Sequence, residues 1–466
     1  MSWLDTAIPV RMRRVALVAP ADALRDVLLR VARTGAVEIG PPAGPEDAEA
    51  QPAAGLAGKG DTAAAFEAQL AAHAAAAVQR SGAAALAGWV PASKLSAVAG
   101  ALAEAGGTVV TLPNPPGVQP PTLVTGPPLR RTVSPLVQTY GTVPYADIDP
   151  VWLAWASYVV MFGMMFGDVG EGAFLVVVAV ALRAGWPRWL RRFRQAWPFV
   201  GGAGLTATVF GLLYGDCFGP NGLVPTLWLD PLDHPGTLLL VAAGFGAALL
   251  AGAYALGMAN RWREGGWPSM LYAPSGCAGT GLFLGAGAAA GGWYIHSGAL
   301  LAAGGLVAVL GLALAAAGFL TESGGGGAGV FQAVIELFDL VVRLGSNVVS
   351  FTRLAAFGLT HAALGLVVWN GSRALWLHAG PSLGGVVSAL GAVLIFGVGT
   401  AVAFCLEALV AAIQALRLEY YELFSRVFVA RGRPFRPWQM PEPEAAKASM
   451  EPLDSMGLMG LMEVTT

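Results

Sequence analysis

Charged residues are scarce in this chain, and their scarcity limits the class of protein that it can be. Lys, Arg, Asp and Glu make up 12% of the 466 residues, whereas hydrophobic residues make up 55%. A soluble protein carries charge on about a quarter of its residues, so a fully soluble fold is excluded. Long windows from residue 151 onward are almost free of charge, which predicts a polytopic membrane protein with a soluble N-terminal part.

Cysteine is also rare, and its placement excludes the common metal and redox motifs. Cys217, Cys277 and Cys405 fit neither a CxxC pair nor zinc-ligand spacing, so free thiols packed among helices are expected. No cofactor or metal site is predicted, and a net charge of −2 gives no basis for predicting nucleic-acid binding. The first residues, MSWLDTAIPVRMRR, lack an apolar core of signal-peptide length, so the N-terminus is expected to stay in the cytoplasm.

The first part of the chain, residues 1–128, is predicted to be a small cytoplasmic α/β domain. Its apolar residues follow a strand–helix–strand pattern that occurs twice. Two such units suggest a ferredoxin-like fold that ends near residue 112. The expected parts are, in order, the unit 10–40, a linker at Pro41–Gly60, an Ala-rich helix at Thr62–Arg80, the strand ALAGWV, a helix at Pro91–Ala105, the strand GTVVTL and a Pro-rich segment 113–128.

Residues 129–437 are predicted to form an α-helical polytopic membrane domain. Its first apolar run, Val151–Leu182, has 32 residues and is too long for one span of about 20. Glycines interrupt the run around Asp168 and Glu171, and arginines flank both of its ends. Because positive flanks stay in the cytoplasm, we expect a hairpin of two short helices that turns near Gly167–Gly172. One long tilted helix is the alternative.

Six further apolar spans follow, which with the hairpin gives about eight. Loop 217–236 lacks Lys and Arg whereas the C-terminal tail carries several arginines, so both termini are expected in the cytoplasm. The last two spans, of 39 and 32 residues, are longer than a bilayer requires and are expected to tilt. Residues 438–466, rich in Pro, Glu, Met and Ala, are expected to be disordered. The six predicted spans are Trp197–Tyr214, Leu238–Asn260, Met270–Trp293, Ala299–Leu320, Val330–Val368 and Gly385–Leu416.

An arginine, Arg353, lies near the centre of the apolar segment Leu344–Leu366. Such a residue costs about 2.5–3.5 kcal/mol on membrane-insertion scales, so it requires a partner and usually has a function. No acid lies within four residues of it on the same helix. Polar residues on this span recur at steps of three and four, which places them on one face. The members of this stripe are Glu336, Asp339, Arg343, Ser346, Asn347, Ser350, Arg353, Thr360 and His361.

A second polar stripe is predicted on the last span. Glu407, Gln414 and Arg417 fall on one face by the same spacing, and Glu422 lies beyond them. Two facing polar stripes inside a bilayer describe a hydrated path for ions. Arg353 then has no counter-charge on its own chain and is expected to meet one on a partner.

Some of these residues also have simpler structural interpretations. Glu336 or Asp339 is equally expected to form an ion pair with Arg343 on the same helix. His361 by itself is typical of a hydrogen-bonding residue between helices. Asp168 is as well explained as the cap of a half-helix at the glycine turn as by any role in transport.

The segments SFTRLAAFGLTHA and LRLEYYELF, together with several others in the same order, resemble the membrane-embedded a/I subunit of rotary V-type and archaeal-type ATPases. The N-terminal segments VALVAPADALRDVLLRVARTGAVEI and GWVPASKLSAVAGALAEAGG are similar to the two α/β lobes of that family. The most specific segments are SFTRLAAFGLTHA and LRLEYYELF, at the family's spacing. The others are YGTVPYADIDP, MFGMMFGDVGEG, FGLLYGDCFG and the residues up to ARGRPFRP, so that the similarity covers most of the chain.

The resemblance implies a stator subunit that forms the proton or Na⁺ half-channels against a ring of proteolipid helices, each with one buried Glu or Asp. Arg353 matches the family's essential arginine and Arg417 its supporting one. Gln414 replaces a histidine found in some members, so a titrating role is absent there. The candidate half-channel residues are Glu407, His361, Asp339, Glu336, Asn347, Ser350, Gln414 and Asp168.

The same resemblance implies partners and a location. The partners are the proteolipid ring, peripheral-stalk and central-stalk subunits and the lipid bilayer, in a prokaryotic plasma membrane. ATP sites lie on other subunits, so no catalytic site or cofactor is expected on this chain. The family has a long coiled coil between its lobes, of which only Thr62–Arg80 remains here.

Two other classes of protein compete with this interpretation. A secondary transporter also has buried charges and glycine-broken helices, but such folds usually contain inverted repeats, and the sequence shows none. The transporter interpretation would also leave the soluble lobe unexplained. An intramembrane hydrolase that uses Ser275 and His361 is the weaker alternative, because SGCAG alone is a poor motif. Co-purification of a small two-helix proteolipid separates the first interpretation from both.

Overall fold

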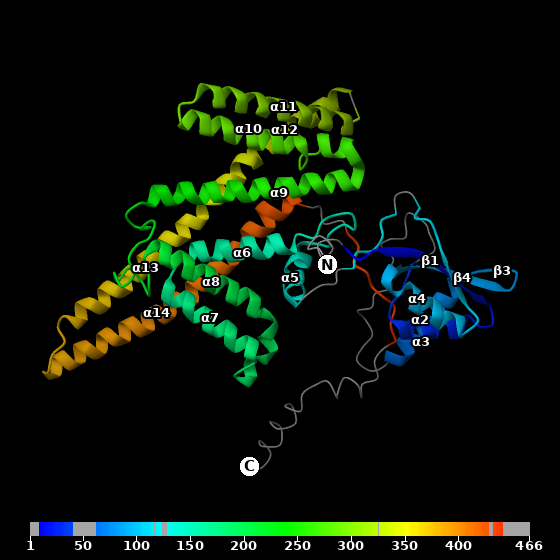
Figure 1. Cartoon of the computed structure of the whole chain (residues 1–466), viewed down its shortest axis with the longest axis horizontal. Coiled ribbons are helices and arrows are strands. Elements are labelled where there is room, and N and C mark those ends of the chain that lie inside the picture. Colours follow the sequence, from blue (N-terminus) through cyan, green and yellow to red (C-terminus); the bar gives the residue numbers. More distant parts are fainter. Residues whose placement is uncertain are drawn as a thin grey trace, which may run out of the picture. The chain divides into compact units, whose positions relative to one another are not determined.

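The computed structural model describes residues 9–40, 62–115, 118–123, 128–324, 326–427 and 432–440. Contacts divide the chain into two compact units (Figure 1). The helical unit comprises Thr125–Arg431, and the α/β unit comprises Val10–Val124 together with residues from Gly432 onward. The linker predicted at Pro41–Gly60 lies outside the described residues.

The α/β unit is an antiparallel sheet with helices that connect its strands. The strand order is β2-β4-β1-β5, in which β1 and β2 flank β4 and run parallel to each other. Two β–α–β units interleaved in this way make the ferredoxin-like arrangement, so that prediction is confirmed. The elements are β1 (Met12–Pro20), α2 (Leu24–Thr34), β2 (Glu38–Ile39), α3 (Thr62–Ala75), β3 (Val78–Arg80), β4 (Ala83–Pro91), a 3₁₀ turn Ala92–Lys94, α4 (Leu95–Ala103) and β5 (Thr108–Thr111).

The Ala-rich helix ends earlier than predicted, because a hairpin follows it. Helix α3 stops at Ala75, and β3 pairs with β4 in a register that places Arg80 opposite Ala83. The two residues between them, Ser81 and Gly82, both have positive φ, at 51° and 77°. This is the backbone that a two-residue hairpin turn needs. The helical prediction for Val78–Arg80 is therefore wrong.

A segment near the C-terminus packs into the α/β unit. Trp438, predicted to begin a disordered tail, is only 8% exposed and stacks on Phe66 with ring centroids 5.3 Å apart. Its backbone N–H donates to the Val37 carbonyl at 2.8 Å. Arg433 and Glu38 form an ion pair of 2.8 Å in the same region. The tail prediction is thus wrong at Trp438, and residues 441–466 lie outside the described residues.

The helical unit contains five helical segments that are long and apolar enough to cross a membrane: Phe193–Tyr214, Pro235–Tyr272, Gly298–Glu322, Gly326–Trp376 and Leu383–Val427. The described residues thus give a membrane-capable architecture without confirming a count of eight spans. Its elements are α5 (Pro128–Tyr140), α6 (Val151–Met165), α7 (Val169–Ala184), a 3₁₀ helix Arg188–Ala196, α8 (Trp197–Tyr214), α9 (Pro235–Tyr272), α10 (Cys277–Tyr294), α11 (Gly298–Glu322), α12 (Gly326–Ser350), α13 (Thr352–Trp376), α14 (Leu383–Leu418), a π-helix Glu419–Phe424 and α15 (Ser425–Val427).

The first apolar run forms two helices, as the hairpin interpretation predicts. Both pack against α8, and the contacts give their directions. Along α6, Val159 lies against Gly202 and Gly163 against Thr206, so α6 runs parallel to α8. Along α7, Gly172 lies against Thr208 and Leu175 against Gly204. Position along α8 therefore falls as the chain proceeds through α7, so α7 is antiparallel to α8. A Cβ atom on Gly172 would approach the Thr208 amide nitrogen to 2.5 Å, which explains why glycine is needed there.

One predicted helix boundary is wrong. The span expected to start at Met270 begins at Cys277 instead, because α9 continues past a kink at Gly266 to Tyr272. The predicted span Val330–Val368 lies inside one membrane-capable helical segment, Gly326–Trp376, which a single turn residue, Phe351, divides into α12 and α13.

Phe351 explains the division between α12 and α13. It is fully buried, and its ring lies against Gly246 of α9, where a Cβ atom would come within 2.2 Å. The interruption therefore coincides with a close packing contact and not with a Gly or Pro at this position. The last span agrees with prediction as a single helix, α14, and the three cysteines are free as expected.

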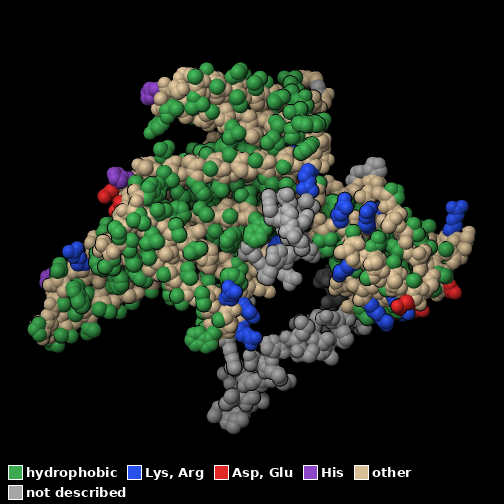
Figure 2. All heavy atoms as spheres, in the orientation of Figure 1, with side chains coloured by type: hydrophobic (Ala, Val, Ile, Leu, Met, Phe, Trp, Pro, Cys, Tyr) green, Lys and Arg blue, Asp and Glu red, His purple; other side chains and the backbone are tan. Residues whose placement is uncertain are grey.

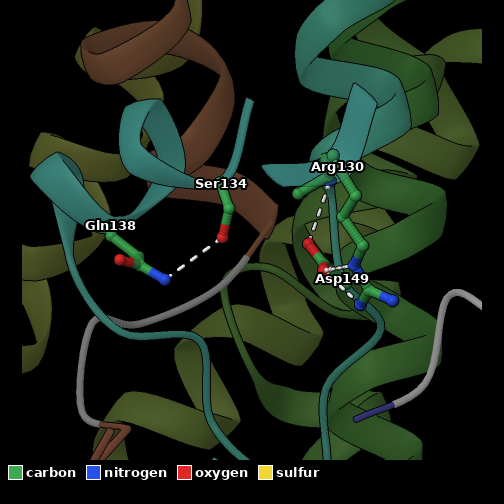
Figure 3. A network of polar contacts seen from close by, with 5 residues as sticks. Arg130, Ser134, Gln138 and Asp149 are labelled. Carbon is green, nitrogen blue, oxygen red and sulfur yellow. Dashed lines mark hydrogen bonds and ion pairs between the residues drawn. The ribbon is translucent and has the colours of Figure 1, made fainter. Parts of the chain in front are cut away.

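Helix α6 is anchored at its start by a buried ion pair. The Arg130 guanidinium on α5 donates from Nε to Asp149 Oδ2 at 2.9 Å, and both side chains are 4% exposed (Figure 3). The other carboxylate oxygen, Oδ1, accepts from the Val151 amide at 3.0 Å and so caps α6. Charged groups this deeply buried are tolerated because each is paired.

Asp147, two residues earlier, is buried without such a partner. It is 0% exposed, and neither carboxylate oxygen has a hydrogen-bond partner within the described part of the chain. Burial, then the nearby Glu264 carboxyl, raises the pKa of Asp147 to about 8, against a smaller opposing effect of Arg261 and Arg263. The folded protein therefore binds a proton here that the unfolded chain releases at much lower pH.

This difference predicts a pH-dependent stability. Between about pH 4, the ordinary aspartate pKa, and pH 8, the folded state holds more protons than the unfolded state, so stability falls as pH rises. The variant Asp147→Asn mimics the protonated form. We expect it to match the wild type at pH 5 and to melt a few degrees higher at pH 9, measured by thermal unfolding of the full chain in detergent.

Asp233→Asn, at an exposed aspartate, is the matched control and leaves both melting temperatures unchanged. A wild type that melts higher at pH 9 than at pH 5, or an Asp147→Asn variant with the wild-type pH dependence, contradicts this account of Asp147.

Candidate functional site

The site is centred on a contact between α13 and α14. His361 of α13 and Glu407 of α14 form a hydrogen-bonded ion pair through Nδ1 and Oε2, and their side chains are 9% and 12% exposed. Glu171, in the first turn of α7, lies beside them, and one ligand atom from each of the three lies within 4.8 Å of the others. These residues line a small pocket together with Phe218 and Gly219 of the loop after α8. Four parts of the helical unit thus meet at one polar point.

Asp168 positions Glu171. Its side chain is fully buried, and Oδ1 accepts from the Glu171 amide at 2.9 Å, which caps the start of α7. Oδ2 accepts from the Gly219 amide at 3.0 Å and so ties the loop after α8 to the same helix end. The capping interpretation of Asp168 is confirmed, because both oxygens are used by backbone donors.

The electrostatics of this pocket are strongly acidic. Asp216, at the end of α8, is 4% exposed and interacts electrostatically with His361, as Asp168 also does. Within the described residues, no Lys or Arg forms an ion pair with any of the four carboxylates around His361. Such a group attracts cations because one imidazole faces four potential negative charges.

Arg353 lies eight residues before His361 on α13, or about 12 Å along the helix axis. It is half-buried, its Nη1 atom has no hydrogen-bond partner among the described residues, and it forms no ion pair with them. The charge of Glu422 nevertheless acts on both Arg353 and Arg417, and Ser350 lies beside the Glu422 carboxylate. The prediction that Arg353 lacks any counter-charge on its own chain is therefore too strong.

Glu422, the acid that acts on this group, lies where the backbone departs from a regular α-helix. It lies in the π-helix Glu419–Phe424 that follows α14, and it is 6% exposed. Inserting a wider turn rotates the side chains that follow it, and such insertions occur often at functional sites.

The stripe predicted along 336–361 does not stay together. Arg343 and Asp339 form an exposed ion pair of 2.6 Å on α12, which confirms the structural interpretation for that pair. Glu336 accepts instead from Gln332 at 2.9 Å. Within the described residues these exposed side chains bond to neighbours on α12 and do not contact the His361 group.

Two more predicted half-channel residues, Asn347 and Gln414, lie outside the His361 group. Asn347 lies between the Arg343 carbonyl oxygen, at 3.0 Å, and the Arg426 guanidinium, at 3.2 Å, with its amide oriented to satisfy both. Gln414 has a buried Oε1 atom without a partner in the described part of the chain. Neither joins the His361 group directly.

The structure also decides against the hydrolase alternative. Ser275 Oγ accepts a hydrogen bond from Arg261 Nε at 3.1 Å, and His361 bonds to Glu407. A serine nucleophile needs its base within hydrogen-bond reach, and these two side chains have separate partners.

A family model described as the V-type ATPase 116kDa subunit family matches residues 74–232 and 327–440. These ranges cover more than half of the chain and include every member of the His361 and Arg353 groups. The chain belongs to this family. The resemblance found in the motifs around Arg353 and Arg417 is thereby confirmed, and a membrane a/I subunit is the class to which the helical unit corresponds.

Individual relatives agree with this family assignment. The A-type ATP synthase subunit I of Aeropyrum pernix is 27% identical over 367 residues, which are 68% of this chain and 51% of the relative. That of Pyrococcus horikoshii is 25% identical over 68% of this chain and 46% of its own length. That of Archaeoglobus fulgidus is 32% identical over a shorter stretch of 140 residues, 29% of this chain and 19% of the relative. The chain spans about half the length of the relatives that it matches most extensively.

Sequence reasoning missed two members of the site. Asp216 follows an apolar helix in the segment FGLLYGDCFG, and an acid just past a membrane-length helix was the available signal. Glu171 was noticed among the glycines, but no spacing rule connects α7 to α13. Their contact depends on the close packing of α7 against α8.

The capping role of Asp168 is testable with two variants. Asp168→Ala leaves two buried N–H groups without an acceptor and removes the cap, so we expect a loss of about 2 kcal/mol or more of stability. Asp168→Asn keeps one acceptor oxygen and is expected to lose markedly less. Thermal unfolding of the full chain measures both, and equal losses would argue against the capping role.

Proposed function

We propose that this chain is the stator subunit of a rotary A/V-type ATPase or ATP synthase and forms the two ion half-channels against a proteolipid ring. The observation that carries the proposal is the pair of polar groups on one helical hairpin, α13 and α14. Arg353 belongs to one group, and His361 with Glu407 belongs to the other. The exposed side chains of α13 and α14 are largely apolar, and Figure 2 shows that hydrophobic side chains cover much of the visible face of the helical unit.

The two groups are proposed to serve opposite sides of the membrane. Glu422, Ser350 and Arg417 lie toward the C-terminal end of α14, where the arginine-rich tail predicts the cytoplasm. The pocket at Glu171 is lined by Phe218, at the start of a loop without Lys or Arg, which predicts the other side. Arg353 lies between these half-channels and separates them.

Arginine suits this separating position for a chemical reason. It stays protonated at all accessible pH values, so it cannot relay a proton from one half-channel to the other. A ring carboxylate at about 4 Å is attracted by about 4 kcal/mol at an effective dielectric near 20. A membrane potential of 100 mV supplies about 2.3 kcal/mol per charge, which is comparable, so the ring is held without being locked.

The partner surface is proposed to be the exposed apolar side of the same hairpin. Helix α14 has 36 residues, or about 54 Å, against a hydrocarbon core of about 30 Å, so it has length enough to lie obliquely across a ring. The proposed partners are the proteolipid ring, the stalk subunits and the bilayer. Exposed apolar residues on α13 and α14 include Leu364, Val367, Val387, Leu390, Val393, Leu406, Leu409 and Ile413.

The first test removes Arg353. In proteoliposomes that contain the complete complex, Arg353→Ala is expected to reduce ATP-driven ion uptake by at least about tenfold. No positive charge is then left to stabilise the ionised ring carboxylate and so release its ion. Arg353→Lys is expected to restore little of it. Uptake is followed with a pH-sensitive or Na⁺-sensitive dye, and assembly is checked by co-purification.

Arg373→Ala, at an exposed arginine near the end of the same helix, is the matched control and keeps normal uptake. Normal acidification by an assembled Arg353→Ala complex would overturn the proposal.

The second test concerns the His361 group. Glu407→Gln keeps the shape of the side chain but removes its charge, so we expect ion uptake to slow several-fold while the ATP sites on other subunits stay intact. Glu322→Gln, at an exposed glutamate on α11, is the control. Unchanged uptake in Glu407→Gln would return Glu407 to a purely structural role.

A further inference from the structure

Three side chains that are far apart in the sequence meet at one point, and all three are of types that bind metal ions. Glu171, His361 and Glu407 each present one ligand atom, and these atoms lie within 4.8 Å of one another. They come from three different helices, α7, α13 and α14, each of which is fixed by packing on its neighbours. Ligand atoms around one tetrahedral Zn²⁺ ion are about 3.4 Å apart, from metal–ligand distances of about 2.0–2.2 Å. Binding of one Zn²⁺ ion therefore requires the ligand atoms of the two glutamates to move closer to each other and to His361 by rotation of their side chains.

The site also contains coordinating atoms that nothing in the described residues satisfies. Glu171 is 95% buried by accessible area, at 5% exposed, yet its Oε2 atom has no hydrogen-bond partner. Glu407 Oε1 is likewise buried without a partner. Buried carboxylate oxygens are normally satisfied, so these two unpartnered atoms beside one imidazole indicate room for a further cationic ligand.

The charges around the three residues favour a cation over any other occupant. Asp168 and Asp216 add their charges near His361. Both oxygens of Asp168 are already used by backbone amides, so it contributes its charge without acting as a ligand. The pocket that these residues line is bounded by Phe218 and Gly219 of the loop after α8.

We propose that Glu171, His361 and Glu407 form a binding site for one Zn²⁺ ion. His nitrogen and Glu oxygen are both zinc donors, and three protein ligands leave the fourth position for water. Mg²⁺ and Ca²⁺ prefer oxygen ligands alone and are expected to bind more weakly. The bond between His361 and Glu407 is replaced by bonds from each of them to the metal.

The consequence for transport is separate and rests on the proposed function. If Glu407 and His361 line a half-channel, a bound Zn²⁺ ion blocks it and slows ion uptake. The binding test below uses the purified chain and requires no transport, so its failure is distinguishable from the failure of the half-channel proposal.

The test measures metal binding to the full chain in detergent or nanodiscs. Zn²⁺ is titrated in competition with a chromophoric chelator, and Co²⁺ is added as a spectroscopic probe whose visible absorption reports tetrahedral coordination. We expect one Zn²⁺ per chain. Glu171→Gln and Glu407→Gln are each expected to weaken Zn²⁺ binding by about 10–100-fold or more. Loss of a residue that only supports a metal ligand costs about that much, and these two residues are the proposed ligands.

His378→Gln and Glu322→Gln replace an exposed histidine and an exposed glutamate elsewhere in the helical unit, and they are expected to bind Zn²⁺ as the wild type does. Melting curves without metal check that each variant is folded. Because glutamine is nearly isosteric with glutamate, these variants keep the proposal testable even if His361→Gln fails to fold. Absence of stoichiometric Zn²⁺, or binding that survives both Glu171→Gln and Glu407→Gln, overturns the proposal.

Discussion

Charged side chains are buried among apolar helices in this protein, and the way they are paired links its elements together. A carboxylate removed from water is stable only with hydrogen bonds or an opposite charge. Asp149 meets this requirement through Arg130, Asp168 through two backbone amides, and Glu407 through His361. Each solution joins two elements that are remote in the sequence, so the polar groups determine how the helices are connected.

Close packing of glycine makes one of these solutions possible. Helix α7 approaches α8 so closely that the Thr208 amide would lie 2.5 Å from a Cβ atom on Gly172. At the same end, Gly211 lies against Asp168. Side chains larger than hydrogen would push α7 outward and carry Glu171 away from His361. The glycines in this segment therefore contribute to the site although they carry no functional group.

Most of the architecture could be predicted from the sequence, and the exceptions have identifiable causes. Hydropathy and glycine placement predicted the α6–α7 break and the single helix α14, because both signals are local. The interruption at Phe351 carries no local Gly or Pro signal, and it coincides with a ring packed against Gly246. Trp438 looked like part of a polar tail because its partner, Phe66, is more than 350 residues away.

Composition and periodicity were enough to predict the class of the protein, and the motifs indicated the family and marked Arg353, His361 and Glu407 as unusual residues. These signals are local, because membrane helices satisfy their own backbone hydrogen bonds. The partners of these residues became visible in the folded chain. Glu171 and Asp216 lie near His361, and Glu422 acts on Arg353, because contacts between helices depend on packing that spacing rules do not contain.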